Sequence, residues 1–116
     1  MTSDELMETL RGIKDPRFTE HVRVLTTAIA SGGAKIGDPA RSIPSHELLD
    51  IYRGRRDGAQ SRGKPTGGLD ALVELFAASQ GETWRIVTVS GAGADGGVFV
   101  SSSGKAGCFA RQAGDP

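Results

Sequence analysis

The spacing of apolar residues changes at Gly81, and this change limits the fold of the 116-residue chain more than any other feature. Before Gly81, apolar residues recur every three or four positions, most clearly over residues 18–29, as on one face of a helix. After Gly81 they alternate, and residues 84–89 place apolar side chains on both faces of a strand. Helices followed by strands predict an α+β fold rather than repeated βαβ units. The length fits a single domain over residues 1–116.

Helical spacing and capping residues locate four helices. Asp15 and Pro16, for example, suit the N-cap and the first turn of the helix that carries residues 18–29. Residues 31–44 contain three glycines and two prolines without a regular period, so we expect a loop there. We expect the helices at residues 3–13, 16–30, 45–54 and 69–79.

The C-terminal part of the chain predicts an antiparallel β meander of two or three strands. We expect strands at residues 83–90, 97–101 and 105–111, with the last two either separate or joined into one strand that bends at Gly104. A meander of this size is marginal in water without a helical cover. We therefore expect the four helices to pack on one face of the sheet.

The segment from Gly91 to Gly96 spells G-x-G-x-x-G, the spacing of a dinucleotide-binding loop. That loop requires a helix after the glycines and an acidic residue about 20 positions further on. Here residues 98–100 are valine, phenylalanine and valine, which favour a strand, and Asp115 in a Gly-Asp-Pro sequence is the only acidic residue that follows them. We predict a solvent-facing turn between two antiparallel strands and no bound nucleotide or other cofactor.

The remaining reactive side chains do not form a recognisable catalytic or metal-binding pattern. His21, His46 and Cys108 have no spacing typical of a metal site, so we predict no metal ion and name no catalytic residue. Cys108 alternates with two alanines, which predicts a buried and unreactive thiol. A single cysteine allows no internal disulfide and is typical of the cytoplasm. No apolar run approaches the length of a membrane span.

Positive charge is concentrated in residues 53–64, which carry five basic side chains and one acidic side chain. Acidic residues outnumber basic ones on both sides of this segment, so its positive potential is local. We expect the third helix to end near Gly54 and a flexible basic loop to follow as far as Gly68. Cations near a helix C-terminus also stabilise the helix dipole, which gives a structural alternative. The predicted partner-binding residues are Arg53, Arg55, Arg56, Arg62 and Lys64.

These observations favour a small cytoplasmic, non-enzymatic binding protein of an accessory, inhibitory or immunity type. Its basic loop would contact an acidic macromolecular partner, because clustered arginines bind carboxylates and phosphates. One alternative is a pocket protein or small enzyme in which a curved sheet encloses a ligand. A second alternative is a nucleic-acid-binding module, although Tyr52 is the only aromatic residue near the basic segment that could stack on bases. The oligomeric state stays open.

Overall fold

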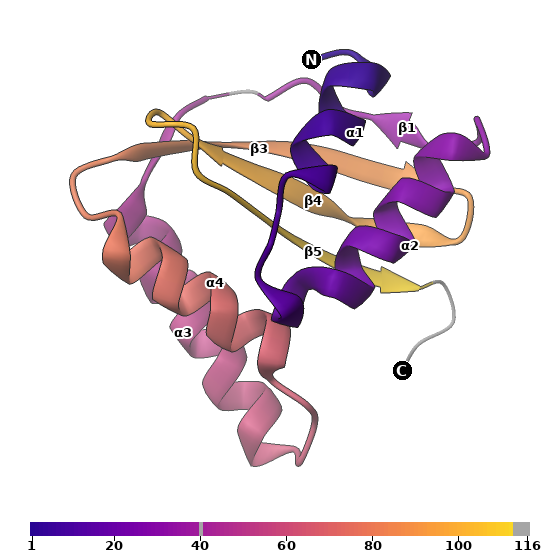
Figure 1. Ribbon diagram of the computed structural model, residues 1–116. Helices are drawn as coiled ribbons and strands as arrows, with labels where there is room; N and C mark the ends of the chain where they lie inside the picture. Colours follow the sequence, from indigo (N-terminus) through magenta and orange to yellow (C-terminus); the bar gives the residue numbers. More distant parts are fainter. Residues whose placement is uncertain (40, 113–116) are drawn as a thin grey trace.

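The computed structural model describes residues 1–39 and 41–112 of the chain (Figure 1). It confirms the predicted α+β class, in which helices precede a C-terminal antiparallel meander. Among the described residues every helix is too short or too polar to span a lipid bilayer. The elements are α1 (Ser3–Arg11), η1 (Pro16–Phe18), α2 (Thr19–Ala30), β1 (Lys35–Ile36), β2 (Ile43–Pro44), α3 (Ser45–Ser61), α4 (Gly67–Ala78), β3 (Thr83–Gly91), β4 (Ala94–Ser101) and β5 (Ala106–Gln112).

The sheet contains two short strands that the sequence did not predict. Its order is β1-β3-β4-β5, and β2 pairs with β3 on the same edge as β1. Both short strands lie within residues 31–44, where we expected a loop. Each has only two residues, which is too short to produce an alternating pattern. Pairing with the edge of β3, rather than local preference, makes these residues extended.

The two helix pairs pack against opposite faces of the sheet, whereas one face was expected for all four helices. Helices α1 and α2 cross the face that carries Val87 and Val98, while α3 and α4 cover one end of the other face (Figure 1). On that second face the ring of Phe76 from α4 meets Trp84 edge-on, with 5.2 Å between ring centroids. Phe99 of β4 is buried in the same aromatic cluster. Because β3 and β4 carry large apolar residues on both sides, each face requires its own cover.

Helix α3 continues to Ser61, so the prediction that it ends near Gly54 and gives way to a flexible basic loop is wrong for these residues. Glycine is unfavourable in a helix interior by roughly 0.5–1 kcal/mol. Packing compensates for this cost, because Tyr52 and Ala59 are buried on the side of α3 that faces α4. The first three arginines of the basic segment are therefore helical, and Arg62 is the C-cap.

The G-x-G-x-x-G segment is a tight turn followed by a strand, as predicted. Ala92 and Gly93 connect β3 to β4, and both have positive φ angles of 53° and 81°. Positive φ at both central residues is typical of the two-residue turns that match the twist of a β-hairpin. The prediction that β4 begins at residue 97 is too late, because Asp95 and Gly96 already pair with β3 and β5. That this turn binds no cofactor stays a prediction.

A buried hydrogen-bond group joins α3, α4 and β3. The Nε1 atom of Trp84 donates to the hydroxyl oxygen of Ser45 at 2.7 Å. The same hydroxyl group donates to the carbonyl oxygen of Ser79 at 2.8 Å, and all three residues are buried. The first turn of α3 and the end of α4 are thereby fixed to the sheet. This attachment positions the helix that carries the basic residues.

Candidate binding surface on α3

The structure separates the five basic residues that the sequence grouped together. Arg53 and Arg55 are exposed and point to different sides of α3, because successive residues of a helix are rotated by about 100°. Arg56 is partly buried toward α4 and pairs with Asp57 at 3.3 Å. Its Nε atom also lies 4.0 Å from a carboxylate oxygen of Asp70 in α4. Arg56 therefore contributes to the contact between α3 and α4.

Arg62 shares the side of α3 on which Arg55 lies. The two residues are seven positions apart, which is close to two helical turns. The Nη1 atom of Arg62 lies 3.3 Å from the position that a Cβ atom on Gly58 would take, so its side chain runs back along the helix toward Arg55. Lys64 follows in the loop after Gly63, which has a positive φ angle of 69°.

Arg55 is held in place by the aromatic cluster. Its guanidinium carbon lies 4.8 Å from the centroid of the Tyr52 ring, and its Nη1 atom donates to the Tyr52 hydroxyl oxygen at 3.3 Å. Tyr52 is buried and meets the ring of Phe99 edge-on at 5.5 Å. Burial raises the pKa of the Tyr52 hydroxyl, and the charge of Arg55 acts in the opposite direction. A cation over an aromatic ring is stabilised and has less freedom to move.

A groove of about 220 Å³ lies beside Arg55 on the part of the sheet that α3 and α4 leave uncovered. Its lining side chains on β3, β4 and β5 share one face of the sheet, as the strand register shows, and the backbone of Gly96 completes the lining. The apolar floor includes Ile86, Phe99 and Phe109, and Asp95 and Arg111 stand across the groove from α3.

The two arginines of the groove have no acidic partner in the described part of the chain. Neither Arg55 nor Arg111 forms an ion pair there. Asp95 is the cross-strand neighbour of Arg111, yet it also forms no ion pair within that part. The groove therefore presents two cations, one anion and an apolar floor.

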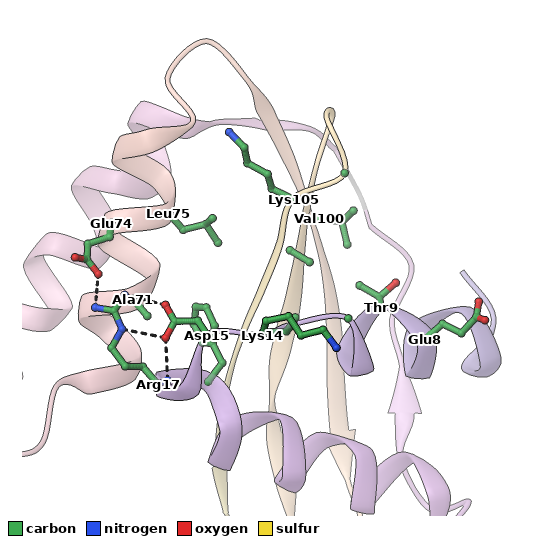
Figure 2. A pocket seen from close by; sticks show the side chains of 15 residues that line it. Glu8, Thr9, Lys14, Asp15, Arg17, Ala71, Glu74, Leu75, Val100 and Lys105 are labelled. Atoms are coloured by element: carbon green, nitrogen blue, oxygen red, sulfur yellow. Dashed lines mark hydrogen bonds and ion pairs between the residues drawn. The ribbon is translucent and has the colours of Figure 1, made fainter.

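A larger hollow of about 860 Å³ lies between the end of α1, η1 and α4 (Figure 2). Two of its three cations, Arg17 and Lys105, are already paired, and the third is Lys14. Arg17 contacts Asp15 at 2.8 Å and also contacts Glu74 of α4. Lys105 pairs with Glu82 at 2.8 Å, and this hydrogen bond is the main reason why the pKa of Glu82 falls to about 2. Since two of the three cations of the hollow are bound by carboxylates, whereas both arginines of the smaller groove lack an ion pair in the described residues, the groove beside α3 is the better candidate for binding an acidic partner.

The contacts of His21 indicate a structural role at the edge of the sheet. Its Nδ1 atom lies 3.0 Å from the carbonyl oxygen and 3.1 Å from the amide nitrogen of Ala110, so it covers the outer edge of β5. Its ring stacks on Phe109 with centroids 4.8 Å apart. The described residues contain no group of three or more histidine, cysteine, aspartate or glutamate side chains placed to hold a metal ion.

Cys108 is buried, as predicted, and burial raises the pKa of its thiol from 9.0 to about 12. At neutral pH this shift lowers the thiolate fraction about a thousandfold, and the thiolate is the reactive form. We expect a thiol reagent to label Cys108 slowly in the native protein and quickly in denaturant. An Ala77→Cys variant, which places a thiol at an exposed position of α4, provides the fast native rate for comparison. Equal rates for the two thiols would show that Cys108 is accessible.

Comparisons with protein-family models, with curated proteins and with solved structures found no match to this chain. The candidate surface consequently depends on the geometry alone. Sequence reasoning identified Arg55 but missed Asp95 and Arg111, which follow it by 40 and 56 positions. Nothing in the local spacing of these residues indicates that they share a groove.

Proposed function

We propose that this protein is a non-enzymatic binding protein that contacts an acidic macromolecular partner through the exposed side of α3. The observation that carries the proposal is Arg55, which is held over Tyr52 at the rim of an apolar groove without a carboxylate partner in the described residues. Arginine beside apolar surface is typical of protein interfaces. An accessory or inhibitory role in the cytoplasm, where a free thiol persists, is the setting that we propose.

An exposed apolar residue on the same side of α3 supports a protein partner. Ile51 is 46% exposed, which makes it one of two large hydrophobic residues exposed in the described chain. It precedes Arg55 by four positions and Arg62 by eleven, so the three residues lie along one side of the helix. A hydrophobic contact surrounded by arginines provides both affinity and orientation at an interface.

The two alternative functions have less support. Nucleic-acid binding would benefit from an exposed aromatic ring, whereas Tyr52 is buried beneath Arg55. A small-molecule site usually has a volume of about 300–1,000 Å³. The groove, at about 220 Å³, is below this range. The larger hollow, at about 860 Å³, is within it, but two of its three cations are already held in ion pairs.

Reversing the charge of this surface is expected to weaken partner binding at least about tenfold, because like charges then face each other across the interface. The variant is Arg55→Glu with Arg62→Glu, and the partner is captured from native lysate with and without nuclease treatment. The matched control is Arg53→Glu with Arg85→Glu, which changes the net charge equally at two exposed positions elsewhere. Melting curves of both variants should stay near that of the unmodified protein.

Three results would contradict the proposal. If the control variant loses as much affinity as the test variant, only net charge matters and no surface is defined. If both variants keep full affinity, the arginines of α3 form a solvated helix surface. Loss of the captured partner after nuclease treatment would identify nucleic acid in its place.

A further inference from the structure

We infer that the groove between α3 and β5 receives one carboxylate side chain from an extended acidic segment of the partner, between Arg55 and Arg111. This inference rests on the proposed function and adds the chemical group that is recognised. The two arginines come from elements far apart in the sequence, and the fold alone brings them to one groove.

The size of the groove fits a single side chain. A volume of about 220 Å³ corresponds to roughly seven water molecules, at about 30 Å³ each. Such a space admits the end of one side chain and is too small to enclose a nucleotide. One position on β4 helps to keep the groove open, because Gly97 shares the groove face with Phe99 and has no side chain to fill it. A Cβ atom on Gly97 would already lie 3.1 Å from the Cγ2 atom of Ile86.

The charges of the groove favour a carboxylate over a phosphate. A planar guanidinium group matches a carboxylate with two parallel hydrogen bonds. Asp95 stands beside Arg111 and leaves the groove with one net positive charge, which a single carboxylate neutralises. The carboxylate of Asp95 also provides an acceptor for a backbone N–H group of the bound segment.

Restricted motion of Arg55 makes binding less costly. Ordering a free side chain at an interface costs about 0.5–1.5 kcal/mol. Arg55 is already fixed by the ring and hydroxyl group of Tyr52, so it loses less freedom when a ligand binds. The arrangement is therefore preorganised on the α3 side of the groove.

The test uses a blocked hexaglutamate peptide as the probe, with titration calorimetry and the NMR signals of the arginine Nε–H groups as readouts. We expect Arg55→Gln and Arg111→Gln each to raise the Kd of the peptide about tenfold, because each removes a charge-assisted hydrogen-bond pair. The matched control Arg53→Gln removes one charge from the opposite side of α3 and should change the Kd less than about twofold. Inorganic phosphate and a thymidine hexanucleotide serve as competing probes.

Three outcomes would overturn the inference: equal effects of Arg53→Gln and Arg111→Gln, no shift of the Arg55 and Arg111 signals, or a phosphate probe that binds the groove as tightly as the peptide. Its failure is distinguishable from failure of the proposed function. If lysate capture depends on Arg55 and Arg62 but Arg111→Gln has no effect on capture or on the peptide, the function stands and the inference fails. If the peptide uses both arginines while no captured partner responds to charge reversal, the groove stands and the proposed function fails.

Discussion

Replacing Gly96 with alanine is expected to destabilise the protein by about 3 kcal/mol or more, at the upper end of the effects of overpacking. An alanine Cβ atom at this position would overlap the carbonyl oxygen of Phe109 and lie 2.8 Å from the Cα atom of Ala110. Both atoms belong to the backbone of β5, which cannot move away without losing its pairing with β4. Urea denaturation measures the loss in the free energy of unfolding. An NMR spectrum that shows partly unfolded protein would indicate that this loss is as large as the stability of the original protein.

The matched control is Gly54→Ala, which makes the same chemical change where space is open. Nothing lies within 4 Å of the position of an added Cβ atom on Gly54, and the residue is inside α3. Alanine is the better helix former, so this variant should be more stable by roughly 0.5–1 kcal/mol. Similar stabilities for the two variants would show that β4 and β5 do not approach each other as closely as described.

Replacing Ser45 with alanine is expected to cost about 1–3 kcal/mol in the free energy of unfolding. The change removes the acceptor of the buried Trp84 N–H group and leaves that donor without a partner. Ser61→Ala is the control, because its hydroxyl group donates to the carbonyl oxygen of Gly58 at the exposed end of the same helix. We expect that variant to stay within about 0.5 kcal/mol of the original.

A double-mutant cycle isolates the contribution of the hydrogen bond. Trp84→Phe removes the donor, so adding Ser45→Ala to it should cost less than Ser45→Ala alone. The difference between the two costs is the coupling energy, which we expect at about 1 kcal/mol. Strict additivity would show that the hydroxyl group of Ser45 stabilises the protein by a route other than Trp84.

Local patterns predicted the helices and the meander because burial repeats along each of these elements. Phe18 and Leu25 recur at helical spacing and are buried, and Val87 and Val89 are buried on either side of the exposed Thr88. The end of α3 could not be predicted in this way, because the glycine at 54 weakens a helix that packing with α4 then sustains. A helix boundary that depends on tertiary contacts cannot be predicted from the local sequence.

The candidate surface was predictable only in part. The charge cluster identified Arg55 and Arg62, since excess charge is visible in any segment of sequence. The groove was not predictable, because Asp95 and Arg111 join it through strand register and the placement of α3. Arg53 and Arg56 were wrongly assigned to the same binding surface as Arg55. They are its neighbours in the sequence, but the rotation of the helix points their side chains to other sides of α3.

The contact between α2 and β5 can form only late in the synthesis of the chain. His21 meets Ala110 across 89 positions of sequence, and β5 is synthesised after every other described element. At about 5–20 residues per second, the ribosome needs roughly 4–18 s to make the intervening stretch. During that interval α1 and α2 lack the contacts that they make with β5 in the folded protein. Helices α1 and α2 therefore wait longer for their contacts with β5 than any described element that follows them.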